Sequence, residues 1–132
     1  MEAQHQISLS VEVNATQKDV FKIWMTSKGH QDLTGDEAQI EAKVGSKHNA
    51  WGDYITGEIL EIEENRRVLM TWRTTEFPQH AKDSTLELLF QEAEAGCRIT
   101  LNHWNLPSDQ VGQYTSGWVE HYLDPIKMHF NT

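Results

Sequence analysis

The sequence has little cysteine and few basic residues, and each shortage excludes a class of protein. Its one cysteine, Cys97, cannot form an internal disulfide, so we expect a cytoplasmic protein. Eleven Lys and Arg stand against 20 Asp and Glu, which gives a formal net charge of −9. Such an acidic chain lacks the basic surface that attracts phosphate backbones and anionic lipids. We therefore expect neither nucleic acid nor a membrane as a partner.

Long hydrophobic runs and targeting signals are also missing. No uncharged apolar stretch approaches the roughly 20 residues that span a bilayer, and residues 1–6 do not resemble a signal peptide. The sequence contains no repeat, low-complexity tract or linker-like segment. With 38% hydrophobic residues, the 132-residue chain can bury one core. We expect a single domain over residues 1–132, present as a monomer or weak dimer.

The N-terminal quarter predicts one strand and two short helices. Residues 7–13 alternate between apolar and polar side chains, the pattern of a strand with one buried face. Thr16 and Asp19 then match a capping box in front of a short amphipathic helix. Residues 27–34 favour a second short helix with little apolar surface.

The middle of the chain predicts an antiparallel meander, because strand-like segments follow one another at intervals of about ten residues. In one of them Ile59 and Ile62 fall on opposite parities, which indicates a β-bulge. The predicted strands are Gln39–Val44, Lys47–Trp51, Ile55–Glu63, Val68–Arg73, Ser84–Phe90 and Cys97–Trp104. The side chains predicted to face inward are Val68, Met70, Trp72, Leu86, Leu88, Phe90, Cys97, Ile99, Leu101 and His103.

The last quarter predicts a long helix with a broad aromatic face, with Ser108 or Asp109 as its cap and a bend at Pro125. Such a face has to lie against an extensive apolar surface, and the concave side of the sheet is the available one. The predicted fold is therefore α+β, a curved antiparallel sheet wrapped around a long C-terminal helix. The stripe contains Tyr114, Trp118, His121 with Tyr122, Pro125 with Ile126, and His129 with Phe130.

Three motifs in this order resemble a known family. They are Gly57–Ile62 running into Arg67–Arg73, Gly96–His103 with Leu106-Pro107, and Gly117-Trp118 with Tyr122 and Ile126-Lys127. Together they are similar to the C-terminal domain of the activator of the Hsp90 ATPase, over residues 7–130. The resemblance implies the helix-grip, START-like fold, whose cavity commonly binds lipids or other apolar molecules. The separate N-terminal domain of the eukaryotic activator has no counterpart in these 132 residues, and Leu33 stands where relatives carry a large aromatic residue.

The first functional hypothesis is a non-enzymatic protein that encloses a small apolar ligand between the sheet and the C-terminal helix. His48 and His103 have inward parity and would be its polar anchors. The alternative, that each is a core histidine hydrogen-bonded to a neighbour, is the more common situation. The remaining predicted lining residues are Met70, Trp72, Leu88, Leu101, Trp118 and Tyr122.

The second hypothesis is an interaction module that docks on an Hsp90-type chaperone through its acidic surface. Trp51 and Trp104 fall on the outward parity of their strands, so they mark a partner surface, a dimer contact or the rim of the sheet, unless loops cover them.

No catalytic residue, cofactor or metal is expected, although a cyclase-like activity inside the cavity stays open through the superfamily. No nucleophile elbow or phosphate-binding glycine loop is present. His121 and His129 lack a second ligand at the spacing of metal-binding helices. Cys97 is interpreted as a small buried hydrophobic residue. Three histidines fall in predicted loops or chain ends: His5, His30 and His80.

Overall fold

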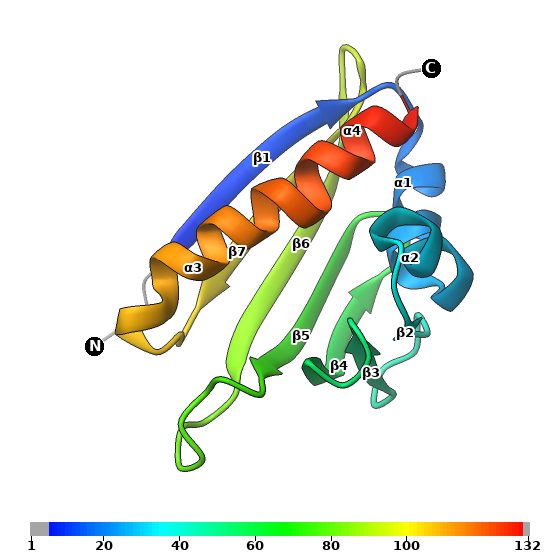
Figure 1. The fold of residues 1–132 in the computed structure, drawn as a ribbon. Coiled ribbons are helices and arrows are strands. Elements are labelled where there is room, and N and C mark those ends of the chain that lie inside the picture. Colours follow the sequence, from blue (N-terminus) through cyan, green and yellow to red (C-terminus); the bar gives the residue numbers. More distant parts are fainter. Residues whose placement is uncertain (1–5, 131–132) are drawn as a thin grey trace.

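A curved sheet of seven antiparallel strands organises the computed structural model, which describes residues 6–130 (Figure 1). The strand order β1-β7-β6-β5-β4-β3-β2 places the first strand beside the last and continues as a meander. This arrangement confirms the predicted sheet. The strands are β1 (Ile7–Val13), β2 (Ala38–Gln39), β3 (Lys47–Ala50), β4 (Ile55–Glu63), β5 (Arg67–Thr74), β6 (Ser84–Ala93) and β7 (Gly96–Trp104).

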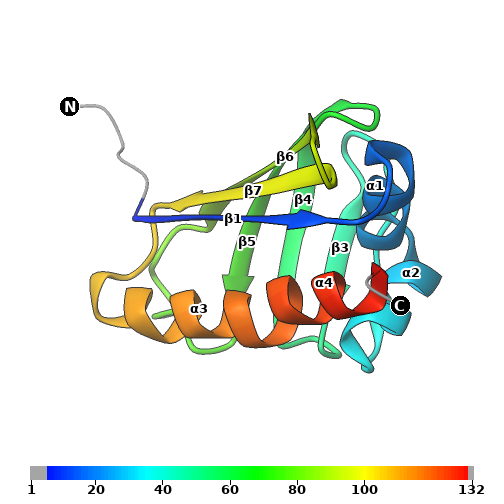
Figure 2. The ribbon, with the colours of Figure 1, turned by 90° about the horizontal axis from the view of Figure 1, so that it is seen from above.

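Helices lie on one side of the sheet, as Figure 2 shows from above. The C-terminal helical segment crosses the concave face, and the two short helices sit together near its C-terminal end. The helical elements are α1 (Gln17–Met25), α2 (Ser27–Thr34), the 3₁₀ turn η1 (Ser108–Gln110), α3 (Val111–Trp118), the π-helical turn η2 (Val119–Leu123) and α4 (Asp124–Phe130).

Threonine caps define the two short helices. The Thr16 side chain accepts a hydrogen bond from the Asp19 backbone N–H at 3.2 Å, as the sequence predicts. Thr26 caps α2 in the same way, through the Gly29 backbone N–H at 3.1 Å. Gly29 is needed for the tight junction, because an added Cβ would lie 2.6 Å from the Ile23 carbonyl oxygen. The predicted second helix is therefore confirmed, with a cap that lies one residue before it.

The strand predicted at Gln39–Val44 is wrong beyond Gln39. The Ser27 hydroxyl accepts from the Ile40 backbone N–H at 3.0 Å and donates to the Ile40 carbonyl at 3.2 Å. Because Ser27 of α2 binds the N–H and the carbonyl of Ile40, the chain leaves the sheet after Gln39 and lies along the helix instead. Val44 ends up 59% exposed in the following loop.

The predicted bulge and inward faces are confirmed. The β4–β5 register shifts between Ile59 and Glu61, which restores the inward parity after the bulge. The side chains from β5, β6 and β7 that were predicted to face inward are all buried in the core.

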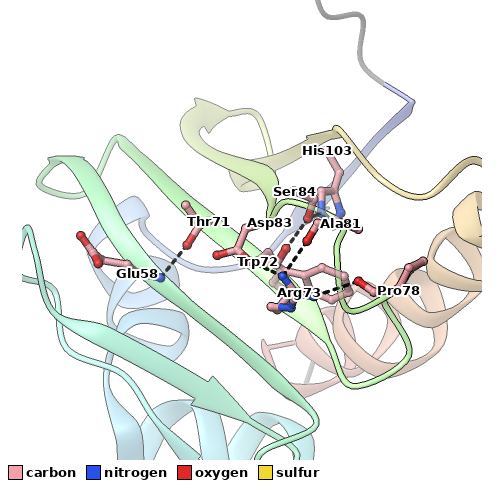
Figure 3. Close-up of polar contacts among 9 residues, drawn as sticks. All are labelled: Glu58, Thr71, Trp72, Arg73, Pro78, Ala81, Asp83, Ser84 and His103. Carbon is pink, nitrogen blue, oxygen red and sulfur yellow. Dashed lines mark hydrogen bonds and ion pairs between the residues drawn. The ribbon is translucent and has the colours of Figure 1, made fainter.

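Arg73 of β5 organises the loop that leads to β6 (Figure 3). Its guanidinium donates to the carbonyls of Ala81 at 2.9 Å and Pro78 at 3.3 Å, and to the Asp83 carboxylate at 2.9 Å. It also lies over the Phe77 ring, 5.4 Å from the centroid. This loop therefore has a fixed shape at the end of the sheet where the C-terminal helical segment begins.

The C-terminal helical segment differs from the prediction at its start and at its middle. Neither Ser108 nor Asp109 caps it by a side-chain hydrogen bond, and a 3₁₀ turn leads into α3 instead. One turn before Pro125 the helix widens to a π turn, closed by a bond from the Asp124 N–H to the Val119 carbonyl. A proline removes one backbone donor and crowds the preceding turn, so the widened turn accommodates it.

The side chains of the predicted stripe include a buried group and an exposed group. Tyr114, Trp118, Tyr122 and Ile126 are buried against the sheet, whereas His121 and His129 are exposed. The placement of the two histidines on the apolar stripe was therefore wrong.

We predict that Trp118→Ala lowers the free energy of unfolding by about 3–5 kcal/mol, because it removes a buried indole from the contact between helix and sheet. Trp118 is 3% exposed, whereas Met128 of α4 is 74% exposed. Met128→Ala is therefore the control, with an expected change within about 0.5 kcal/mol. Urea denaturation of both variants measures the difference, and a cost below about 1 kcal/mol for Trp118→Ala would contradict this role.

Candidate functional site

A chain of hydrogen bonds runs from Trp118 of the C-terminal helix into the sheet through His103, and Figure 3 shows its part from His103 through Ser84 to Trp72. The Trp118 indole Nε1–H donates to His103 Nδ1 at 3.1 Å. On its other side, His103 Nε2 lies 2.8 Å from Ser84 Oγ, and that hydroxyl donates to the Trp72 carbonyl at 2.5 Å. An indole can only donate, so His103 Nδ1 is the acceptor and Nε2 carries the proton. The chain therefore has one direction, from Trp118 to the backbone of β5.

The distance between Ser84 Oγ and His103 Nε2 is that of a nucleophile and its base, but the direction of the hydrogen bonds does not suit catalysis by this pair. A general base needs a free ring nitrogen facing the hydroxyl. Here the nitrogen facing Ser84 carries the hydrogen, and the hydroxyl hydrogen is directed to the Trp72 carbonyl. Both side chains are fully buried. The pair stabilises the core and offers no attacking group.

His48, the other predicted anchor, also binds the backbone of β5. It pairs with Gly57 across β3 and β4, and its Nε2 donates to the Thr71 carbonyl at 2.9 Å. A Cβ on Gly57 would collide with both of those groups, so the glycine makes room for the imidazole. At the same place the Glu58 backbone N–H donates to the Thr71 hydroxyl at 2.8 Å, as Figure 3 shows. Side chains thus complete the irregular part of the β4–β5 ladder.

His48 therefore holds the Thr71 carbonyl of β5 directly, whereas His103 is linked to the next carbonyl, that of Trp72, through the Ser84 hydroxyl. The Trp72 ring packs edge-to-face on His103 at 4.7 Å and on Tyr114 at 5.0 Å between centroids. It also meets Trp118 at 5.5 Å. Four of the side chains predicted to line a ligand cavity thus contact one another: Trp72, His103, Trp118 and Tyr122.

His30 was missed by the sequence reasoning, which placed it in a loop. It lies in α2 and is buried, with Nδ1 2.9 Å from the Trp24 carbonyl and Nε2 2.9 Å from the Tyr122 hydroxyl. Because a carbonyl only accepts, Nδ1 donates and the Tyr122 hydroxyl donates to Nε2. The bond ties α2 to the π turn η2. The spacing of His30 and Leu33, three residues apart after a threonine cap, was the signal that could have located it.

Two small voids lie between the sheet and the C-terminal helix. The inner one, about 10 Å³, touches His48, Met70, Trp72, Trp118 and Tyr122 of the predicted lining. The rim void, about 60 Å³, shares Ile55, Trp72, Trp118 and Tyr122 with the inner one and adds Trp51, Tyr114, Gly117 and His121.

Leu88, Leu101 and His103 line neither of these voids and are fully buried in the core. Neither void approaches the roughly 300 Å³ of an ordinary small-molecule site. Trp51, expected on the outward side of a strand, instead occupies the turn after β3 and is half-buried against this rim.

Burial determines the charge state of the interior. Desolvation lowers the pKa of His103 to about 3, and it also lowers the pKa values of His30 and His48. Burial raises the pKa of the Cys97 thiol to about 11, in keeping with its interpretation as a small buried hydrophobic residue. The three imidazoles are therefore neutral at pH 7.

Residues 6–130 hold no group of three or more His, Cys, Asp or Glu side chains placed to bind a metal ion. They also contain no helix with the length and apolarity needed to cross a bilayer. His5 lies outside the described residues.

We predict that the protein loses stability as the pH falls below 6.5, because the histidines then become protonated in the unfolded chain while the buried imidazoles of the folded protein stay neutral. With its folded pKa near 3, His103 contributes stability that is present above pH 6.5 and is lost toward pH 3. Its share between pH 7.5 and 4.5 is about 2–3 kcal/mol. His103→Gln keeps one donor and one acceptor without titrating. Urea denaturation at both pH values should show a shallower pH dependence for this variant, and equal slopes would contradict a neutral His103.

We also predict that Gly57→Ala destabilises the fold by at least about 2 kcal/mol, because the methyl group displaces His48 from the Thr71 carbonyl. Gly112 in α3 is the matched control, since a Cβ there meets no atom within 4 Å. Gly112→Ala should be neutral or stabilise by up to about 1 kcal/mol. Thermal unfolding compares the two, and equal melting temperatures would refute the proposed packing at Gly57.

Solved structures with this architecture support the fold assignment. An Hsp90 activator from Plasmodium falciparum superposes with a TM-score of 0.85 at 20% identity, covering 93% of this chain and 94% of its own. CalU16 from Micromonospora echinospora gives a TM-score of 0.74 at 20% identity, covering 94% of this chain and 73% of its own. At this identity the likeness establishes the helix-grip, START-like fold.

Sequence relatives identify the family. The mouse activator of 90 kDa heat shock protein ATPase homolog 1 is 22% identical over 125 residues, or 95% of this chain, and the human protein is 21% identical over the same length. The chain spans only 37% of the length of either relative. The model of the family described as activator of Hsp90 ATPase homolog 1-like proteins matches residues 14–131. The chain therefore belongs to the family of activator of Hsp90 ATPase homolog 1-like proteins.

Proposed function

We propose that this domain is a non-enzymatic interaction module that docks on an Hsp90-type chaperone ATPase. The observation that carries the proposal is the family match over residues 14–131, to proteins described as activators of that ATPase. The packed interior supports it, because buried side chains use the polar groups that a ligand or a reaction would need. The outer surface is then the part of the molecule available for function. The small apolar ligand stays a prediction.

The charge of the surface supports docking on a basic partner. Among residues 6–130, Lys28, Arg67, Arg73 and Arg98 form ion pairs with five carboxylates. The chain as a whole has 20 Asp and Glu against 11 Lys and Arg, which is a formal net charge of −9. Complementary charge speeds association and is screened by salt. We therefore expect the complex to weaken as the ionic strength rises.

The length of the relatives bears on the expected affinity. This chain matches 37% of the length of the mouse activator, and the affinity expected here is that of this domain by itself. Two linked binding modules hold a partner far more tightly than either one alone. A domain acting alone should form a weak, transient complex.

The test is the ATP turnover of an Hsp90-type chaperone from the same host, measured as this protein is added up to tens of micromolar, the range of weak transient contacts. We expect turnover to rise, and to rise less at about 300 mM than at about 50 mM salt. Sedimentation velocity of the same mixtures should show a complex. Unchanged turnover together with no detectable complex would contradict the proposal.

Two charge variants, matched in net charge, test whether docking uses a particular face of the domain. Glu92 and Glu94 are exposed at the β6–β7 hairpin, whereas Glu37 and Asp53 are exposed beside the β3–β4 turn, at the opposite end of the sheet. Replacing either pair by lysine changes the net charge by +4, from −9 to −5. Unequal losses of stimulation would support a docked face, and equal losses would indicate long-range attraction alone.

A further inference from the structure

The first strand, β1, forms one edge of the sheet. In the part of the chain that the structure describes, β1 pairs with β7 over all seven residues and has no strand on its other side. Figure 2 shows it at the margin of the sheet. Its outer backbone N–H and carbonyl groups are therefore placed to pair with another strand.

The opposite edge of the sheet is protected in ways that β1 is not. There the last strand, β2, has only two residues, and Lys47 of β3 lies beyond its end. Short strands and lysine side chains both oppose association between sheet edges. By contrast, β1 has seven residues in unbroken register with β7 and contains no proline, glycine or lysine. Its one charged residue, Glu12, is already paired with Arg98 at 3.1 Å.

The middle of β1 also leaves apolar surface uncovered. The inward-facing residues at its two ends, Ile7 and Val13, are 3% and 1% exposed. Leu9 and Val11 lie between them on the same face, but they are only half-buried. The core and the C-terminal helix therefore do not fully cover the middle of this strand. A further strand beside β1 would bury more of both side chains, which favours association.

The sequence of β1 is complementary to itself in the antiparallel direction. When two copies pair about Ser10, Leu9 of each copy lies opposite Val11 of the other. On the outer face, Ser8 lies opposite Glu12, so no two like charges are opposed. A slip by one residue would place Glu12 among the inward-facing apolar side chains of the other copy. The alternation of β1 therefore specifies the register.

We propose that two copies of this protein associate through β1 in this register and form a two-fold symmetric dimer with one continuous sheet. The same strand is used by both copies, and the symmetry axis passes beside Ser10. The contact is one strand wide, so we expect a weak dimer, with a dissociation constant of at least about 10 µM.

The response to salt separates this dimer from chaperone docking. Each copy carries a formal net charge of −9, so the two copies repel each other. Salt screens this repulsion, and the dimer should therefore become tighter as the ionic strength rises. The proposed chaperone complex should become weaker under the same change. The two proposals can thus fail independently.

The test is sedimentation velocity of the whole protein from about 10 µM to about 1 mM, at about 50 and about 300 mM salt. We expect a shift from monomer to dimer with concentration, which occurs at a lower concentration in the higher salt. Hydrogen exchange of the β1 amides should slow at the higher protein concentration, because the dimer pairs the outer N–H groups of this strand.

Two lysine variants on the outer face of β1 test the register. Ser10→Lys places two lysines opposite each other and should weaken the dimer at least about threefold, whereas Ser8→Lys places each lysine opposite Glu12 and should tighten it at least about twofold. Thr85→Lys is the control, because it adds the same charge to the outer face two strands away, on β6. Both effects are measured relative to this control, and thermal melts establish that the three variants are folded.

Three results would overturn the proposal. The first is a protein that stays monomeric at the highest concentration in both salts, which is also the result expected if β1 pairs only with an extended segment of another protein. The second is a dimer that leaves hydrogen exchange in β1 unchanged. The third is an equal effect of Ser8→Lys and Ser10→Lys on the dissociation constant.

Discussion

The hydrogen-bond chain from Trp118 through His103 and Ser84 to Trp72 is the interaction on which the rest of the structure depends. It links the C-terminal helix to three neighbouring strands, and every buried donor in it has an acceptor. A buried polar group without a partner costs about 1–3 kcal/mol, so removing any member exposes the others to that penalty. The chain therefore fixes the helix on the sheet and holds Trp72, around which the other aromatic rings pack.

The same arrangement leaves two small voids, of about 10 and 60 Å³, between the sheet and the C-terminal helix. His48 binds the backbone of β5 from the other side of Trp72, and His30 ties the Tyr122 hydroxyl to α2. The three histidines are thereby engaged in holding elements together. What remains available is the acidic exterior, which suits a protein partner, and the small apolar pocket at the rim beside Trp51.

The sequence predicted those features that depend on local periodicity. The first strand, the β4 bulge and the inward position of Trp72, His103 and Trp118 all follow from alternation or helical spacing. The alternation along a strand predicts that a side chain points inward, but it does not predict whether that side chain meets a cavity or another side chain. The residues that line a ligand site could therefore not be predicted from the sequence. The buried position of His30 was missed because its partner, Tyr122, is distant in the sequence. The end of β2 was missed because Ser27 binds backbone groups that a longer strand would have used.

The protonation state of His103 tests the central claim most directly. Nitrogen-detected NMR of the imidazole distinguishes a hydrogen on Nε2 from one on Nδ1 and follows it with pH. The hydrogen-bond chain requires a neutral ring with its hydrogen on Nε2, unchanged down to about pH 4 because burial lowers the pKa to about 3. A hydrogen on Nδ1, or titration near pH 6.5, would mean that the chain from Trp118 to Trp72 does not exist.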